Sequence, residues 1–340
     1  MELFSETSSG NGKEKMKKEG LEVDMQEVSV IIPNYNGMAY LDGVLSSLER
    51  QTLENFEVIL VDNGSTDGSG AFVASHFPWV HLIELEDNFG FSRAVNVGIR
   101  AARAPYVLLL NNDTEADKDF LKEMTEALRR HKKAFSCQAK MIQFHDRDCL
   151  DDAGNYYCSL GWAYARGKGK PVSAFEKEEK IFTCCAGAAI YRKKIFEKIG
   201  YFDDEHFAYL EDLDVGYRAR IYGYENWYAP KALVYHVGSG TSGSRYNHFK
   251  IRYSSRNNIY MIYKNMPLIQ IVINLPFLVM GFGAKIVFFC MKGFGREYLA
   301  GIKNGFQISR KGKKVPFSFS HLGAYFRIQA ELWANMIRRI

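Results

Sequence analysis

The chain has 340 residues, 47% of them hydrophobic and 24% charged, which is enough apolar material for one large core or two smaller ones. Its six cysteines show no Cys-x-x-Cys spacing, which excludes the disulfide framework of a small secreted domain. The net charge of +5 conceals an asymmetry. Residues 241–340 hold 16 Lys and Arg against 2 acids, a net of +14, whereas the other 240 residues hold 28 bases against 37 acids, a net of −9. This pattern favours contact between the basic part and an anionic surface.

Residues 1–26 are polar and aperiodic, which predicts a disordered leader. After them, short apolar runs alternate with polar loops and helical patterns. The expected strands are Val28–Ile32, Phe56–Val61, His81–Leu85 and Tyr106–Leu110, and the expected helices are Leu41–Gln51, Ala71–His76 and a segment that ends near Arg103. Strand, loop and helix repeated at this spacing predict an α/β fold with a mainly parallel central sheet.

Polar residues follow these strands at the edge where open α/β sheets bind ligands. Asp62 ends the second run, where its carboxylate could accept a hydrogen bond from a nucleobase or ribose, and Asn111-Asn112-Asp113 follows Leu110. A helix cap is the alternative for this second segment, because Asp and Thr cap helices well. No Gly-x-Gly-x-x-Gly follows the first strand and no Gly-x-x-x-x-Gly-Lys-Ser/Thr is present, which disfavours a dinucleotide site and a P-loop.

Several ordered motifs resemble the family 2 glycosyltransferases. They are Val-Ser-Val-Ile-Ile-Pro-Asn-Tyr-Asn-Gly (28–37), Val-Ile-Leu-Val-Asp-Asn-Gly-Ser-Thr-Asp-Gly-Ser (58–69), Asn-Phe-Gly-Phe (88–91), Asn-Val-Gly-Ile (96–99) and Leu-Leu-Leu-Asn-Asn-Asp (108–113). The pattern is most similar to bacterial rhamnosyltransferase-like members and covers residues 28–243. The resemblance implies a GT-A nucleotide-diphospho-sugar transferase domain over residues 27–243 and an inverting reaction.

The resemblance also implies a metal site for Mg²⁺ or Mn²⁺. The family's Asp-x-Asp motif is replaced by Asn111-Asn112-Asp113, so that Asp113 is the expected charged ligand, joined by His236. A structural His at a strand end is the alternative for His236. The residues implied for the nucleotide sugar are Pro33, Tyr35, Asn36, Asp62, Asn88, Arg93, Asn111 and Asn112. Arg93 could pair with the diphosphate, or it could be a solvated helix residue.

A second motif block begins with the small residues around Gly187 and continues to Glu211 and Asp212, which lie in the first turn of an expected helix. Acids there also stabilise a helix dipole, which is the alternative explanation. The family resemblance implies that Asp212 is the general base and that Glu211 and Gly187 contribute to the acceptor site. Residues 146–179 have no period and predict a loop or hairpin, and the Gly/Ser stretch after His236 is expected to close over bound donor.

The resemblance implies dTDP-L-rhamnose as the donor, with a UDP-hexose as an alternative. The acceptor would be a hydroxyl of a cell-surface glycan or of a polyisoprenyl-diphosphate-linked precursor. A sugar-nucleotide-binding protein without catalysis is the rival from another class. The intact set of Asp62, Asp113, Asp212 and His236 argues against that rival.

Residues 244–340 predict a helical, membrane-associating region. The stretch Pro267–Ala284 has no charged residue and just reaches the length that spans a bilayer, although Pro276 makes an in-plane helix equally compatible. A packed helical cap on the catalytic domain is the third alternative. The basic residues predict an anionic membrane surface as partner, at the cytoplasmic face of a bacterial inner membrane. They match no nucleic-acid recognition motif, so no nucleic-acid partner is expected.

Overall fold

The computed structural model describes residues 26–238 and 246–338. Apart from Gln26, the predicted leader lies outside the described residues, as does the Gly/Ser stretch 239–243.

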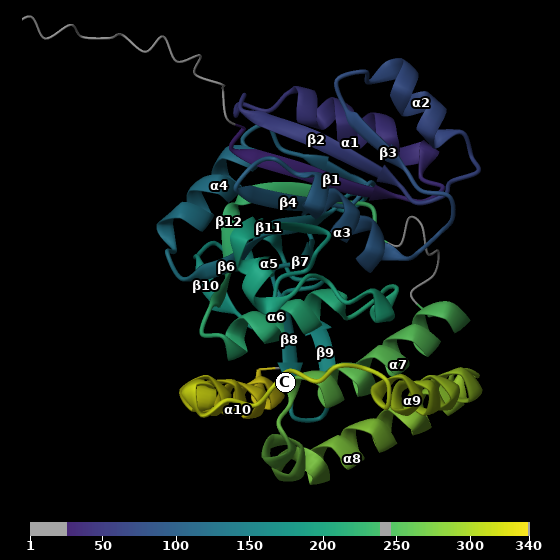
Figure 1. The fold of residues 1–340 in the computed structure, drawn as a ribbon, viewed down its shortest axis with the longest axis vertical. Coiled ribbons are helices and arrows are strands. Elements are labelled where there is room, and N and C mark those ends of the chain that lie inside the picture. Colours follow the sequence, from purple (N-terminus) through teal and green to yellow (C-terminus); the bar gives the residue numbers. More distant parts are fainter. Residues whose placement is uncertain (1–25, 239–245, 339–340) are drawn as a thin grey trace, which may run out of the picture.

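A mixed sheet forms the centre of the α/β part of the chain, residues 28–236 (Figure 1). Its strands are β1 (Val28–Asn34), β2 (Phe56–Asp62), β3 (His81–Glu84), β4 (Tyr106–Leu110), β5 (Thr114–Ala116), β6 (Ala134–Gln143), β7 (Leu150–Asp152), β10 (Glu179–Ile181), β11 (Ala188–Arg192) and β12 (Glu225–His236). The order is β10-β12-β6-β11-β4-β1-β2-β3, with β5 paired to β12 and β7 to β6. Strands β3, β2, β1 and β4 are parallel neighbours, and β6 is parallel to β12, whereas β11 runs antiparallel to β4 and β6. The prediction of a mainly parallel sheet is confirmed.

Helices cover both faces of this sheet. They are α1 (Met38–Glu49), α2 (Ser69–His76), α3 (Phe91–Ala101), α4 (Phe120–Arg130), α5 (Lys193–Ile199) and α6 (Glu211–Ile221). Short 3-10 turns span Val172–Ala174, Asp204–His206 and Phe319–His321. The predicted hairpin within residues 146–179 is present as β8 (Asn155–Cys158) and β9 (Trp162–Ala165).

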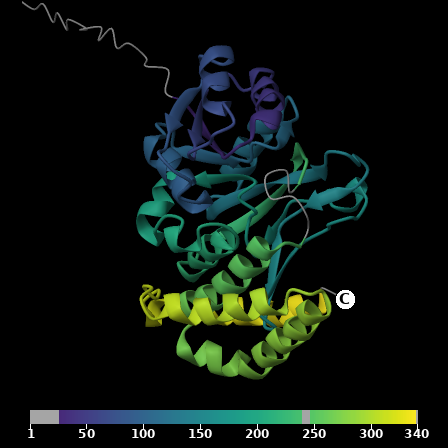
Figure 2. The ribbon, with the colours of Figure 1, turned by 90° about the vertical axis from the view of Figure 1, so that its right-hand side faces the viewer.

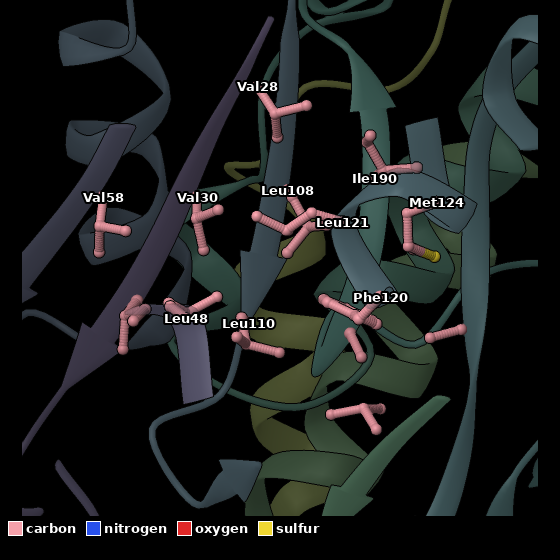
Figure 3. Packing of buried hydrophobic residues seen from close by; sticks show 14 of the residues in the cluster. Val28, Val30, Leu48, Val58, Leu108, Leu110, Phe120, Leu121, Met124 and Ile190 are labelled. Atoms are coloured by element: carbon pink, nitrogen blue, oxygen red, sulfur yellow. The ribbon is translucent and has the colours of Figure 1, made fainter. Parts of the chain in front are cut away.

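Alternate residues of the buried strands feed two separate cores, as the twofold period of a strand requires. Val30 and Leu108 pack with α1, α2 and α4 on one face, as Figure 3 shows in part, whereas Ile31 and Leu109 pack with α3, α5 and α6 on the other. Because both faces are buried, these strands are continuous apolar runs, which made them recognisable in the sequence.

Four helices follow the α/β part and lie beneath it in Figures 1 and 2. They are α7 (His248–Asn265), α8 (Leu268–Met291), α9 (Gly295–Ser309) and α10 (Leu322–Ile337). A third core joins them to α6: Leu213 and Tyr217 of α6 pack with Met261 of α7, Leu278 of α8 and Ile328 of α10. Helix α6 is therefore buried on two sides, between the sheet and the C-terminal helices.

Helix α8 has a polar buried stripe and an apolar exposed surface. Gln270 accepts a hydrogen bond from the Tyr217 hydroxyl (2.9 Å), and Asn274 exchanges two hydrogen bonds with Gln329 of α10 (2.7 and 2.9 Å). In contrast, Leu268 and Val279 are 72% and 66% exposed. The helix is long and apolar enough to cross a membrane, yet only 17% of its most apolar window is buried in the protein. Helix α8 thus packs on α6 and α10 through its polar stripe, which is compatible with a helical cap, and leaves much of its apolar surface exposed.

Candidate functional site

The parallel register brings the first group of site residues together. Asn34 and Asp62 are the paired last residues of β1 and β2, and β4 lies on the other side of β1. Asn34 donates to Asp62 Oδ1 (2.8 Å) and accepts from Asn112 Nδ2 (2.8 Å). A Cβ on Gly37 would lie 2.0 Å from Asn112 Nδ2, so only glycine leaves room for this pair. Asn112 thus links the strand ends from within the protein.

Most of the hydrogen-bonding capacity of the Asp62 carboxylate is used by contacts within the protein. It is 5% exposed, and besides Asn34 its carboxylate accepts hydrogen bonds from the Ser65 hydroxyl and from the Ser65 backbone N–H (3.2 Å). Its geometry therefore holds the loop that follows β2 in place. A hydrogen bond to a nucleoside would use lone pairs that these contacts leave available.

The residues around this loop differ in exposure. Tyr35 is 36% exposed and Pro33 is partly buried within β1. Asn36 has a positive φ of 49° and accepts from the Thr66 N–H (2.8 Å), so its side chain ties the first loop to the second. Asn88 accepts from Asn63 (2.9 Å). These contacts bring the predicted nucleotide-sugar residues to one edge of the sheet.

Arg93 lies at the start of α3 and is exposed. Its guanidinium stacks 4.2 Å above the ring of Phe89, in the loop that precedes the helix. This placement leaves the cation at the edge where the strand-end loops meet, and it is compatible both with a diphosphate contact and with a solvated helix residue.

A chain of charged groups lies where β12 ends. β12 pairs with β5 and β6 so that His236 is opposite Thr114 and Gln143, and this register places its Nε2 3.3 Å from Asp113 Oδ1. The other ring nitrogen, Nδ1, is 2.8 Å from Asp151 Oδ2, and Lys168 pairs with Asp151 Oδ1. Asp113, His236 and Asp151 are all largely buried, so these contacts are shielded from solvent.

These buried contacts shift the pKa values of His236 and Asp151. Burial lowers the pKa of His236, but hydrogen bonds to Asp113 and Asp151 and their negative charges outweigh it and raise the pKa to about 9. Burial raises the pKa of Asp151, but His236 and Lys168 lower it to about 2. With no ion bound, His236 is therefore a protonated bridge between two carboxylates.

Two of these groups could hold a divalent cation. Within residues 26–238 and 246–338, no group of three or more His, Cys, Asp or Glu side chains is arranged around a metal position. Asp113 and His236 supply two adjacent donor atoms, and Asp151 holds the second nitrogen of the imidazole, as carboxylates commonly do behind a ligating histidine. The donor set fits an ion that takes its other ligands from a diphosphate and water.

Glu211 and Asp212 begin helix α6, and both carboxyls are surrounded by protein. Asp212 accepts from the backbone N–H of Leu213 (2.7 Å) and of Ala186 (3.3 Å). Glu211 is 7% exposed, and its Oε2 has no hydrogen-bond partner among the described residues. Burial raises the pKa of both groups, that of Asp212 to about 6 even though its backbone hydrogen bonds oppose the rise. Asp212 is therefore a carboxylate able to take a proton near neutral pH.

A two-residue segment joins the two carboxylate centres. The Ala186 N–H donates to Asp212, and the Gly187 carbonyl accepts from the Asn111 N–H (2.9 Å), two residues before Asp113. A Cβ on Gly187 would lie 3.1 Å from the Asn111 amide, so a small residue is needed there. Asp152, next to Asp151 on β7, is influenced by the charges of both Asp151 and Asp212. Asp152 therefore lies within electrostatic range of both carboxylate centres.

The turn before α6 has an unusual backbone. Phe207, Tyr209 and Leu210 have positive φ values of 60°, 72° and 67°, which are strained for residues with a Cβ. Asn257 of α7 is fully buried, and its amide donates to the carbonyls of His206, Ala208 and Tyr209 at 2.7 to 2.8 Å. This single amide holds the strained turn that aims Glu211 and Asp212.

Asp214 is a structural residue. It is 0% exposed and accepts from Arg218 (2.8 Å), Lys264 (3.0 Å) and Asn265 (2.7 Å). Burial opposes ionisation, but Arg218 and Lys264 hold the pKa of Asp214 well below its usual range. With all its partners inside the protein, Asp214 is unsuited to accept a substrate proton.

The structure also shows residues that the sequence reasoning missed. Asp151 and Lys168 lie in the stretch 146–179, which has no hydrophobic period. Asn257 lies in a helix of the basic region that was predicted to associate with a membrane. The adjacent acids Asp151-Asp152 in an otherwise irregular segment were the one available signal.

Fold and site define a GT-A glycosyltransferase. The chain belongs to glycosyl transferase family 2, whose family profile matches residues 29–200. It is 26% identical over 237 residues to N-acetylglucosaminyl-diphospho-decaprenol L-rhamnosyltransferase of Mycobacterium tuberculosis, a match that covers 63% of this chain and 77% of that protein.

Two solved structures share the fold. One is S. aureus TarS 1-349 in complex with UDP-GlcNAc (TM-score 0.52, 18% identity, 86% of this chain and 94% of that chain). The other is GalNAc-T7 with UDP, GalNAc and Mn²⁺ (TM-score 0.57, 13% identity, 71% of this chain). The chain covers only 48% of GalNAc-T7. At these identities the similarity shows a common fold.

Proposed function

We propose that this glycosyltransferase is inverting and metal-dependent, and that it transfers L-rhamnose from dTDP-L-rhamnose to a hydroxyl of a lipid-linked or cell-surface glycan precursor. The observation that carries the proposal is the segment Ala186–Gly187. It joins the Asp212 carboxylate to the loop that contains Asp113, and Asp113 contacts His236 at the end of β12. A base and a group of phosphate-binding residues so connected are what a direct displacement on a sugar nucleotide needs.

In the proposed reaction the acceptor hydroxyl attacks the anomeric carbon of the donor. Asp212 takes the hydroxyl proton as the new C–O bond forms, and the bond to the nucleoside diphosphate breaks with its electron pair leaving on oxygen. One displacement inverts the configuration. The backbone N–H groups of Leu213 and Ala186 orient the Asp212 carboxylate throughout. A divalent cation bound by Asp113 and His236 would stabilise the charge of the leaving diphosphate.

The residues at the other strand ends are proposed to bind the donor. Asp62 is the last residue of β2, Asn36 and Asn88 lie in the loops that follow β1 and β3, and Tyr35 is exposed next to Asn36. The interlocked hydrogen bonds of these loops preorganise the site before the donor arrives. Arg93 would meet the diphosphate from the start of α3, and Glu211 and Gly187 would shape the acceptor side.

The rhamnose donor and the lipid-linked acceptor rest on the rhamnosyltransferase from M. tuberculosis, whose name contains both. Two features support the proposed location at the cytoplasmic face of a membrane. They are the exposed apolar side chains of α8 and the basic charge of residues 241–340. We propose that α8 lies in the plane of the membrane surface, because its polar stripe is already bonded to Tyr217 and Gln329.

A thermal-shift panel tests the proposal, because a ligand that binds only the folded state raises its stability. The panel compares dTDP-L-rhamnose, UDP-glucose and UDP-GlcNAc, each with and without Mn²⁺, and is followed by a donor-hydrolysis assay. The expected result is a Mn²⁺-dependent shift that is largest with dTDP-L-rhamnose, together with slow hydrolysis. A larger thermal shift with a UDP-sugar would mean that the donor is that UDP-sugar and not dTDP-L-rhamnose. Binding without hydrolysis or transfer would favour a non-catalytic binding protein.

A further inference from the structure

A pocket of about 340 Å³ separates the candidate catalytic site from the apolar helix α8. Its walls come from β9, the strained turn before α6, and helices α7, α8 and α9. The residues that matter for its chemistry are Tyr209, Leu210, Lys250, Lys285, Phe289 and Tyr298. The lining combines two lysines with aromatic side chains and hydroxyl groups, unlike an ordinary apolar crevice.

One wall of this pocket adjoins the start of helix α6, which carries the proposed catalytic carboxylates. Tyr209 and Leu210 immediately precede Glu211 and Asp212, so the turn that aims the carboxylates also forms a wall of the pocket. Lys250 lies close enough to Asp113 to interact with its charge: burial and Lys168 lower the pKa of Lys250, and Asp113 opposes them. A ligand held at Lys250 is therefore near both the proposed base and the proposed metal ligand.

The other end of the pocket is formed by α8. Lys285 is the only charged residue among the 24 residues of this helix. Its ammonium lies 5.9 Å from the ring centre of Trp162, whose Nε1 donates to the Gly281 carbonyl (2.9 Å), so the β8–β9 hairpin holds this part of the helix. Next to the pocket residue Phe289, the side chains of Val287 and Phe288 are 60% and 40% exposed. The pocket thus adjoins a surface that suits hydrocarbon chains.

We propose that this pocket binds the diphosphate of a lipid-linked acceptor, with Lys250 and Lys285 as its cationic contacts and the hydrocarbon chain on the exposed face of α8. The proposal rests on the proposed function and adds the acceptor's anchoring site to it. Two lysines match a diphosphate in charge and hydrogen-bonding capacity. A sugar attached to that diphosphate would extend past Tyr209 toward Asp212. Position and chemistry therefore agree on one ligand class.

The test is a binding titration of the full-length protein in a detergent with neutral headgroups, with farnesyl diphosphate as the probe. The double variant Lys250→Ala/Lys285→Ala should raise the Kd at least tenfold, because it removes both charge-assisted contacts to the diphosphate. Lys250→Arg/Lys285→Arg should restore affinity to within a few-fold, which separates lost charge from misfolding. The affinity for dTDP should fall less than that for farnesyl diphosphate in the alanine variant, because Lys250 interacts with the charge of Asp113 whereas Lys285 lies beside the ring of Trp162.

Matched controls make the result specific. Lys292→Ala/Lys303→Ala removes the same charge from exposed positions outside the pocket and should leave the Kd unchanged. Farnesol should bind all variants equally and weakly, and inorganic diphosphate should compete with farnesyl diphosphate. Equal affinity of the pocket variant and the control variant for farnesyl diphosphate would overturn the inference, as would a loss of dTDP binding equal to that of farnesyl diphosphate. Failure of the wild type to turn over any sugar nucleotide would instead overturn the proposed function.

Discussion

At the scale of single residues, the position of Asp212 explains how a partly buried carboxylate can accept a proton near neutral pH. Surrounding protein raises its pKa to about 6, and two backbone N–H groups keep the charged form accessible.

Asp212→Asn removes the proton acceptor while keeping size and most hydrogen bonds. Turnover should fall by about 10²–10⁴, the usual contribution of a general base, with donor affinity unchanged within a few-fold. Steady-state kinetics and donor titration measure both, and Asp148→Asn, an exposed acid, is the control. Near-normal turnover would move the base to Glu211, because Asp214 is committed to Arg218 and Lys264.

The raised pKa of Asp212 also predicts a pH profile. The base acts as a carboxylate, so its active fraction falls when the pH drops through a pKa of about 6. At saturating donor and Mn²⁺, kcat/KM for the acceptor should decline about tenfold per pH unit below that value and be flat above about pH 7. The small residual rate of Asp212→Asn should lack this acidic limb. A wild-type profile that stays flat to about pH 5 would contradict the assignment.

Asp151 illustrates a residue that acts through another. Its carboxylate holds His236 Nδ1, so that Nε2 faces Asp113. Asp151→Asn should weaken Mn²⁺-dependent donor binding about 10–100-fold, the usual effect of losing a carboxylate behind a ligating histidine, and leave Mn²⁺-free binding unchanged. Donor titrations with and without Mn²⁺ separate the two effects. Equal weakening in both conditions would show that Asp151 supports the loop and has no part in metal binding.

At the scale of secondary-structure elements, the strained turn 207–210 depends on a helix outside the family match. Asn257→Ala would remove the amide donor from the Ala208 and Tyr209 carbonyls, whereas the His206 carbonyl keeps its hydrogen bond from Arg256, and would loosen the turn. Unfolding should become easier by about 1–3 kcal/mol, the range for unsatisfied buried groups, and kcat should fall more than donor affinity. Chemical denaturation and kinetics give the two values. Arg252→Ala, an exposed position on the same helix, should change neither. A variant with lower stability and normal kcat would mean that the turn keeps its shape without Asn257.

The elements that the sequence predicted are those whose signals are local. The strands β1, β2 and β4 are largely apolar runs, and the polar loops after them follow from where each run ends. Asp151 reaches His236 through the pairing of β7 with β6, and Asn257 reaches the turn through packing between α7 and α6. Contacts between distant segments leave no periodic trace, so these residues could not be predicted from their neighbours in the sequence.

At the scale of the whole molecule, the change of composition after residue 243 does not coincide with a break in packing. Helix α7 supplies Lys264 and Asn265 to buried Asp214, and Met261 to the core around α6. The C-terminal helices therefore complete the catalytic part while carrying the exposed apolar surface. The division at residues 243 and 244 remains a proposal about function, and a truncation there would open the core beside Asp212.

Surface substitutions on α8 consequently test membrane binding better than truncation does. Leu268, Val272 and Val279 are 72%, 57% and 66% exposed, so changing all three to Gln should leave the thermal stability within about 2 °C. Each apolar side chain fully buried in lipid contributes about 1.5–3 kcal/mol, so the triple variant should bind vesicles at least tenfold more weakly.

The Lys and Arg residues add about 1 kcal/mol each near anionic lipid, an effect that salt screens over about 10 Å. The wild type should therefore float with anionic vesicles, bind neutral ones less, and be released only in part by high salt. Trp79→Gln, a change at an exposed apolar residue of the catalytic part, should have no effect on flotation. If the wild type and the triple variant floated equally, α8 would not be the membrane contact, and its exposed face would have to meet another protein surface.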